Sequence, residues 1–251
     1  MGEFREWEDY FYDAPHNGTL RNLWGIVDPD DLHVVESRII ADRLLELENG
    51  VVSIARTFDA EHVQAIHRHL AGDLYEWAGQ FRVVGMTKQN PPHLWVDPDL
   101  PSYTHFAPPA RIPQAVESIG RSVKEWEWAS LSQDEVADDL ARFHRTLNTA
   151  HPFREHNGRV TRVYMRHVAE YAGYRLVGPN DERGAHIAAV IAADRGNIEP
   201  LADLYRQRLR PATVEPQRLS ERAERLLLYR SVSGYDRPNI APSAQRYGPY
   251  Q

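Results

Sequence analysis

Apolar residues recur at the period of an α-helix through most of this 251-residue chain. The clearest stretch is 131–150, whose apolar residues are spaced by 4, 3 and 4 positions: Val136, Leu140, Phe143 and Leu147. Ser132, with Glu135 three residues later, forms the sequence pattern of a capping box at a helix start. A stripe with this spacing buries one face of a helix. The chain is therefore expected to build its core mainly from packed helices.

The same spacing, together with caps and with glycine or proline stops, predicts further helices. They are expected at 28–50, 58–79, 116–126, 158–173, 183–194, 199–210 and 217–231. Two short β-prone runs, 81–84 and 94–96, flank a polar loop that contains prolines, which predicts a hairpin. The expected fold class is all-α, a helical bundle with one small β-hairpin.

Composition excludes several classes of protein. The net charge of −7 argues against direct nucleic-acid binding, because such proteins present a basic surface. No apolar run is long enough to span a membrane, and the acidic, aromatic N-terminus lacks the pattern of a signal peptide. The chain has no cysteine, which fits a reducing cytoplasm and leaves no thiol nucleophile.

The densest chemistry lies in residues 148–162, NTAHPFREHNGRVTR, between two predicted helices. Pro152 cannot continue the preceding helix, and Asn157 is a candidate N-cap of the next one. A helix start presents N–H groups and a partial positive charge, so it favours an anion. Helical spacing places Arg159 and Arg162 on one side of the second helix, away from its apolar face. Guanidinium groups beside a helix start suit a polyphosphate.

Two other side chains add chemistry to this anion site. Glu155 is a hard oxygen ligand, and Mg²⁺ is usually held by one or two carboxylates together with substrate phosphates. His151 is a candidate general base, because the ordinary pKa of histidine, about 6.5, is close to neutral pH. Taken singly, such residues are more often structural or solvated. Together they describe attack by a hydroxyl on a nucleotide phosphate.

The stretch HPFREHNGRVTR resembles the signature of the Fic family, His-Pro-Phe-x-(Asp/Glu)-Gly-Asn-Gly-Arg-x-x-Arg. It matches every defined position except the first glycine, where His156 stands. The segments LRNLWGI, IHRHLAGDLYEWAGQFR and LNTAHPF also look like Fic landmarks. The resemblance covers residues 8–210 and implies the Fic fold, with a hairpin flap over the active site. It leaves 211–251 as a C-terminal helix and a poorly ordered tail.

The resemblance implies adenylylation, the transfer of AMP from ATP to a Ser, Thr or Tyr hydroxyl of a target protein. His151 would deprotonate that hydroxyl, and Glu155 would bind Mg²⁺. The nucleotide would be held by Asn157, Gly158, Arg159, Arg162, His156 and, as a weaker adenosine contact, Asn197. The segment 82–96 would be the flap that docks the target, with Arg82, Val83, Val84 and Lys88. Phosphorylating relatives of the Doc type carry Lys at the position of Gly158, so glycine favours adenylylation.

His156 is the departure from the family pattern. If this position needs a positive φ, a residue other than glycine carries a cost of about 1–2 kcal/mol. A protonated imidazole would attract phosphate, whereas a neutral one could crowd the nucleotide, change which nucleotide fits or weaken turnover. We favour a retained nucleotide site with altered efficiency. A glycine restored there should raise adenylylation if strain is the problem.

Regulation is also implied by the resemblance. Many Fic proteins are inhibited by a helix with the pattern (Ser/Thr)-x-x-x-Glu-(Gly/Asn), whose Glu pairs with the second signature arginine, here Arg162. Residues 220–225, SERAER, fit this pattern except at the last position. The lack of a complete copy suggests a small separate antitoxin that carries the inhibitory helix. The expected role is a bacterial, cytoplasmic toxin of a toxin–antitoxin pair.

Three alternatives remain open. The first is a catalytically impaired Fic-like module that binds nucleotide or a partner, disabled by His156. The second is transfer of another nucleotide, or of a phosphoryl group. The third is a metallohydrolase that draws on the histidines at 62, 67, 69, 144 and 151, although no two-His-plus-carboxylate spacing supports it.

Overall fold

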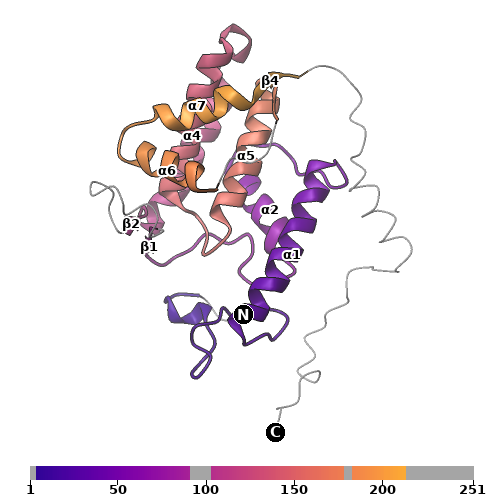
Figure 1. Cartoon of the computed structure of the whole chain (residues 1–251), viewed down its shortest axis with the longest axis vertical. Helices are drawn as coiled ribbons and strands as arrows, with labels where there is room; N and C mark the ends of the chain where they lie inside the picture. Colours follow the sequence, from indigo (N-terminus) through magenta and orange to yellow (C-terminus); the bar gives the residue numbers. More distant parts are fainter. Residues whose placement is uncertain (1–3, 91–102, 178–182, 213–251) are drawn as a thin grey trace. The chain divides into compact units, whose positions relative to one another are not determined.

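The computed structural model describes residues 4–90, 103–177 and 183–212 (Figure 1). Within them the chain is mostly helical, and the predicted fold class is confirmed. The helices are α1 Pro29–Glu48, α2 Ala60–Ala71, α3 Ile112–Glu125, α4 Gln133–Ala150, α5 Asn157–Tyr171, α6 Arg183–Asp194 and α7 Glu199–Arg208. The helix predicted at 217–231 and the tail after it lie outside the described residues.

The described residues form two compact units, and the boundary runs through α2 after His67. The smaller unit contains α1, which begins at the N-cap Asp28 with a proline in its first turn, and the stretch Arg68–Ala78. In the second of these segments Tyr75 stacks on Trp77, with ring centroids 4.4 Å apart. The larger unit contains Ala55–His67 and Gly79–Val214. It holds every side chain of the predicted active site.

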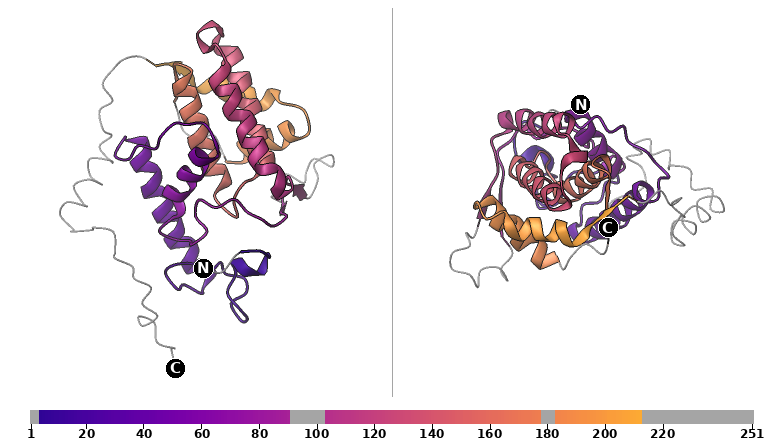
Figure 2. Two further views of the ribbon diagram at one scale, coloured as in Figure 1. Left: turned by 180° about the vertical axis from the view of Figure 1, so that it is seen from behind. Right: turned by 90° about the horizontal axis from the view of Figure 1, so that it is seen from above.

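Helix α4 is central to the larger unit, where it packs against α3, α5, α6 and α7 (Figures 1 and 2). The predicted capping box at Ser132 is present: its hydroxyl accepts from the Glu135 N–H, and the Glu135 carboxylate accepts from the Ser132 N–H. The apolar stripe of this helix is buried, with at most 5% of any member exposed: Val136, Leu140, Phe143 and Leu147. This packing fixes the C-terminal end of α4, where the signature begins.

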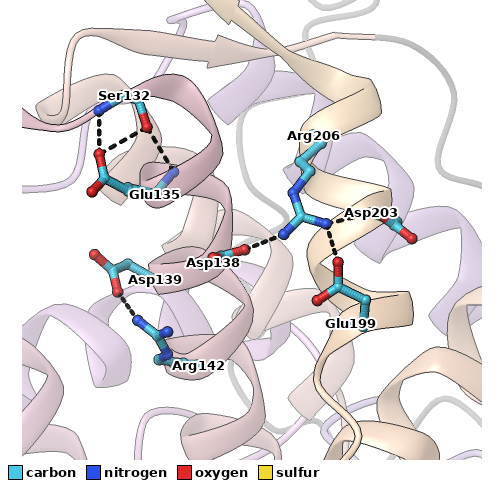
Figure 3. Close-up of polar contacts among 8 residues, drawn as sticks. All are labelled: Ser132, Glu135, Asp138, Asp139, Arg142, Glu199, Asp203 and Arg206. Atoms are coloured by element: carbon cyan, nitrogen blue, oxygen red, sulfur yellow. Dashed lines mark hydrogen bonds and ion pairs between the residues drawn. The ribbon is translucent and has the colours of Figure 1, made fainter.

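Polar contacts join α4 to α7 (Figure 3). Arg206 of α7 pairs with Asp138 of α4, and its guanidinium also donates to Glu199 and Asp203 of its own helix. The Arg206 side chain is 24% exposed, so water screens these ion pairs only in part. Arg142 pairs instead with Asp139 of its own helix.

Two small antiparallel sheets accompany the helices. Strand β1 Thr87–Gln89 pairs with β2 Tyr103–His105, and β3 Tyr174–Leu176 pairs with β4 Leu209–Pro211. A hairpin was expected here, but its strands differ from the prediction. Residues 81–84 are not a strand, the partner of β1 is 103–105, and the predicted run 94–96 lies outside the described residues. The sheet β3–β4 was not predicted.

The helix predicted at 58–79 ends earlier, at Ala71. The next residue, Gly72, has no room for a side chain, because a Cβ there would lie 2.5 Å from the carbonyl oxygen of Arg68. The residues after it form turns up to Gly79, which has φ of 81°. The apolar residues of 72–79 therefore continue the helical spacing without continuing the helix.

Candidate active site

The candidate site is built on the turn between α4 and α5. Helix α4 ends at Ala150, and its C-cap His151 has a left-handed backbone with φ 44° and ψ 64°. The N-cap of α5 is His156, also left-handed, with φ 62° and ψ 11°. Asn157 was predicted as this N-cap and is instead the first helical residue. Two left-handed residues, five positions apart, reverse the chain and aim the start of α5 back toward the end of α4.

Asn157 and Phe153 hold the loop closed. The Asn157 side chain accepts from the Phe153 N–H at 2.8 Å and donates to the Phe153 carbonyl at 2.7 Å. Phe153 is fully buried and stacks on His67 with ring centroids 3.9 Å apart. Both the oxygen and the nitrogen of the Asn157 amide are thus hydrogen-bonded within the loop. The side chain therefore shapes the loop before α5, a role that the sequence did not predict.

His151 is oriented by two neighbours. Its Nδ1 lies 3.3 Å from the carbonyl oxygen of Asn148, and its ring stacks on Phe106 at 3.6 Å. A carbonyl only accepts hydrogen bonds, so this contact places the proton on Nδ1 and leaves the lone pair on Nε2. Burial, together with the nearby charges of Lys88 and Arg82, lowers the pKa of His151 to about 3. The free protein therefore carries a neutral imidazole here at neutral pH.

Arg82 has a different place from the one predicted. It was expected on the target-docking flap, but its side chain is 1% exposed. Its guanidinium donates to four backbone carbonyls, those of His151, Ala150, Ala107 and Val84, at 2.6–3.0 Å. Its N–H donates to the Pro152 carbonyl at 2.8 Å. Arg82 therefore clamps the turn that carries His151, and it does not face a target.

The other predicted flap residues lie on or just before the hairpin. Val83 is 61% exposed, Val84 is half-buried and Lys88 is an exposed residue of β1. The remainder of the predicted flap, from residue 91 onward, lies outside the described residues.

A cavity of about 620 Å³ lies over the start of α5. This volume is in the range of small-molecule sites. The predicted residues that line it are Lys88, His151, Glu155, His156, Asn157, Gly158, Arg159 and Arg162. The lining of one cavity therefore carries the imidazole, the carboxylate and the guanidinium groups together.

Asn197 is not brought to this cavity. It is exposed in the turn between α6 and α7, where its N–H donates to the Ala192 carbonyl at 2.9 Å. The prediction of an adenosine contact there is not supported by its position. The cavity wall is instead completed by side chains that the sequence did not single out: Asn148, His186, Ile187, Val190, Ile191 and Asp194. Asp194 accepts from the Asn148 amide at 2.9 Å, so it braces the residue whose carbonyl orients His151.

The position of Glu155 suits a single carboxylate ligand of Mg²⁺. Its side chain is 35% exposed and lines the cavity, and one of its oxygens pairs with Arg154 at 2.6 Å. A lone carboxylate beside an anion site fits Mg²⁺ that arrives with phosphates, because the phosphates and water supply the other ligands. In the described part of the chain, no three His, Asp or Glu side chains gather to hold a metal by themselves.

The histidines of the metallohydrolase alternative do not gather into a metal site in the described part of the chain. His62 Nε2 lies 2.8 Å from Nδ1 of His167, and His144 Nδ1 lies 2.7 Å from the Tyr205 hydroxyl. Burial is the first cause that lowers the pKa of His62, to about 4, and of His67, to about 3. Such side chains are neutral and engaged in the core.

Among the helices the structure describes, none has the length and apolar character needed to cross a bilayer.

Comparison with known proteins gives a family. Residues 57–169 match the model of the Fic/DOC family. The chain is 34% identical over 203 residues to protein adenylyltransferase VbhT of Bartonella schoenbuchensis, an alignment that covers 81% of this chain and 40% of that protein. It is 26% identical over 206 residues to an Escherichia coli protein named "Probable protein adenylyltransferase Fic", covering 82% of this chain and 92% of that one. The chain thus spans less than half of the first relative.

Solved structures show the same fold. The N-terminal Fic domain of a VirB-translocated Bep effector protein from Bartonella quintana, with bound ADP, has a TM-score of 0.68 at 25% identity and covers 82% of this chain and 96% of its own. The BepC protein of Bartonella tribocorum, with bound AMPPNP, has a TM-score of 0.67 at 24% identity and covers 82% of this chain and 98% of its own. With this signature, this fold and the match over residues 57–169, the chain contains a domain of the Fic/DOC family.

Proposed function

We propose that this protein is an adenylyltransferase, which transfers AMP from ATP to a hydroxyl of a target protein. The observation that carries the proposal is the shared cavity of His151, Glu155, Arg159 and Arg162 at the start of α5. It combines a neutral imidazole with a cationic cradle for phosphate. The names of the relatives, protein adenylyltransferases, support the same chemistry.

In the proposed reaction, the Nε2 lone pair of His151 takes the proton of the attacking hydroxyl. The hydroxyl oxygen forms a bond to the α-phosphorus, and the bond from that phosphorus to the bridging oxygen of the β-phosphate breaks. Pyrophosphate leaves with the electron pair of the broken bond. A bound triphosphate would raise the low pKa of His151, because four negative charges beside an imidazole favour its protonated form.

Arg159, Arg162 and the N-terminus of α5 would stabilise the negative charge of the leaving pyrophosphate. Glu155 would hold the Mg²⁺ that accompanies ATP, and this ion would neutralise phosphate charge. Gly158 lines the cavity without a side chain. A Cβ here would make only an ordinary contact, at 3.5 Å, with the Arg162 Nη1, so the space that glycine leaves would be space for the ligand. The absence of a side chain there suits close approach of a phosphate to the helix start.

The target would dock at the β1–β2 hairpin. A two-stranded sheet has open edges, and an extended segment of another protein can add to such an edge by main-chain hydrogen bonds. Lys88 of β1 lines the cavity, so this edge leads to His151. A Ser, Thr or Tyr in the added strand would then reach the base.

Two labels on ATP test the proposal. Bacterial lysate incubated with the protein, Mg²⁺ and ATP labelled at the α-phosphate should yield labelled protein, whereas ATP labelled at the γ-phosphate should not. Label from the γ-phosphate would favour phosphoryl transfer. Binding of ATP with neither label transferred would favour the impaired, nucleotide-binding module. Preferential labelling from GTP or UTP would show that the protein transfers another nucleotide by the same chemistry.

We also propose that the protein acts as a toxin held in check by a small separate antitoxin. Support comes from the family's inhibitory pattern, which residues 220–225 match only in part. Induced expression of the protein alone should slow bacterial growth, and His151→Ala should grow normally. Equal growth of both strains, at equal protein levels, would argue against the toxin role.

A further inference from the structure

The residue that departs from the family signature contacts an arginine of the same site. His156 Nδ1 lies 2.9 Å from Nη1 of Arg159, three residues later on α5. Both residues line the cavity. His156 is 5% exposed, and its ring lies 6.4 Å from that of His67, which itself stacks on the buried Phe153. The imidazole is therefore buried, and one of its nitrogens reaches the guanidinium.

The chemistry of the pair fixes which atom accepts. A guanidinium has five N–H donors and no acceptor, so His156 Nδ1 must carry the lone pair in this contact. The contact therefore requires a neutral imidazole with its proton on Nε2. Glycine, which the family signature has at this position, offers no side-chain acceptor at all. The contact is a property of this chain's own sequence.

We propose that His156 is a positioning residue that holds the guanidinium of Arg159 in place for the phosphates of the nucleotide. One N–H of Arg159 is used by His156, and the guanidinium keeps four others for phosphate oxygens. Arginine loses side-chain freedom when it binds a ligand, and a partner that orders it beforehand reduces this loss. The inference rests on the proposed nucleotide site. In it, the histidine accepts a hydrogen bond from Arg159, which glycine could not do.

The backbone conformation at position 156 determines which substitutions separate loss of the hydrogen-bond acceptor from relief of strain. Position 156 has φ 62°, so a glycine keeps the conformation and loses only the acceptor. Alanine loses the acceptor and keeps the strain. Asparagine is the matched control, because it tolerates the left-handed region and its Oδ1 is attached at the same place as Nδ1 of histidine.

The test is the dissociation constant of ATP, ADP and AMP with Mg²⁺, measured by calorimetry for the full chain and its variants. We expect His156→Gly and His156→Ala to weaken ATP binding by roughly two- to tenfold, the cost of ordering one long side chain. His156→Asn should stay within about twofold of the wild type, since it restores the acceptor. AMP, which lacks the outer phosphates, should be affected least if Arg159 contacts those phosphates.

A double-mutant comparison tests whether His156 acts through Arg159. In an Arg159→Ala background, His156→Ala should produce no additional loss of ATP affinity. An equal loss in both backgrounds, or glycine binding ATP as tightly as histidine, would overturn the assignment, as would a wild type that binds none of the three nucleotides. These measurements read binding and not transfer. A protein that binds ATP with this pattern but transfers no AMP would contradict the proposed function and leave the role of His156 standing.

Discussion

At the scale of single residues, the site depends on two histidines in a backbone conformation that L-residues rarely adopt. His151 and His156 both have positive φ, and both line the cavity. Strain of this kind persists when the surroundings fix it, and it is concentrated at functional sites. Phe106 and Asn148 fix the first histidine, and Arg159 contacts the second.

His156→Gly should therefore raise stability while it weakens ATP binding. Relief of the left-handed conformation contributes about 1–2 kcal/mol, and the extra freedom of glycine in the unfolded chain removes about half of this. We expect a net gain of about 0.5–1 kcal/mol in the free energy of unfolding in urea. A loss of stability of similar size would show that the imidazole contacts outweigh the backbone strain.

Arg82→Met should lower stability and AMP transfer together. Methionine keeps most of the apolar stem, but the carbonyls of Ala150, His151 and Ala107 lose their shared donor. Leaving buried acceptors unsatisfied costs about 1–3 kcal/mol each, so we expect a loss of at least about 2 kcal/mol in the free energy of unfolding. Urea titration measures it. A variant with wild-type stability and wild-type transfer would contradict the clamp.

At the scale of elements, the α4–turn–α5 unit could be read from the sequence because its signals are local. The capping box, the buried stripe and the proline all act within a few residues. The clamp by Arg82 and the part of the cavity wall formed by α6 could not be predicted, because they arise from chain segments far apart in sequence. Helical spacing of Ile187 and Val190 indicates a buried face and does not say what it faces. The strands β3 and β4 are three residues each, too short for a periodic signal.

The start of α5 gives a prediction that separates stability from binding. Gly158→Ala should stabilise the helix by up to about 1 kcal/mol, because alanine is the better helix former. The new methyl group would make only ordinary contact, at 3.5 Å, with Arg162 in the protein itself. It would stand in the cavity, so ATP affinity should fall. Thermal unfolding and calorimetry measure the two effects, and unchanged affinity would contradict the assigned phosphate position.

The α4–α7 contact gives a second prediction at this scale. Arg206→Ala should lower the free energy of unfolding by about 0.5–1 kcal/mol, because one partly buried guanidinium serves three carboxylates on two helices. Arg142→Ala is the control: its side chain is 61% exposed and its pair lies within α4, so its effect should be smaller. Added salt should reduce the difference between the variants. Equal effects would argue against a cross-helix network.

At the scale of the whole molecule, buried neutral histidines make the larger unit sensitive to acid. Burial lowers the pKa of His62 to about 4 and of His67, His151 and His167 to about 3, against about 6.5 in an unfolded chain. Below pH 6.5 the unfolded chain binds protons that the folded chain does not. Their stabilising contribution is therefore complete above about pH 6.5 and is lost as pH falls toward the folded-state values.

Urea unfolding at pH 7, 6 and 5 checks this expectation. The free energy of unfolding should fall between pH 7 and pH 5, and the loss should steepen below pH 6. Each histidine adds at most about 1.4 kcal/mol per pH unit. Bound ATP should oppose the change only for His151, because the phosphates would favour its protonated form. A stability that is constant from pH 7 to pH 5 would contradict the burial of these groups.

The central claim is that His151 in this cavity moves AMP onto a protein hydroxyl. Intact-mass spectrometry of the protein and its lysate partners after incubation with ATP and Mg²⁺ tests it most directly. His33→Ala, an exposed histidine of α1, is the control. The account predicts a mass increase of one AMP with the wild type and with His33→Ala, and none with His151→Ala. No increase with the wild type, or the same increase with His151→Ala, would contradict it.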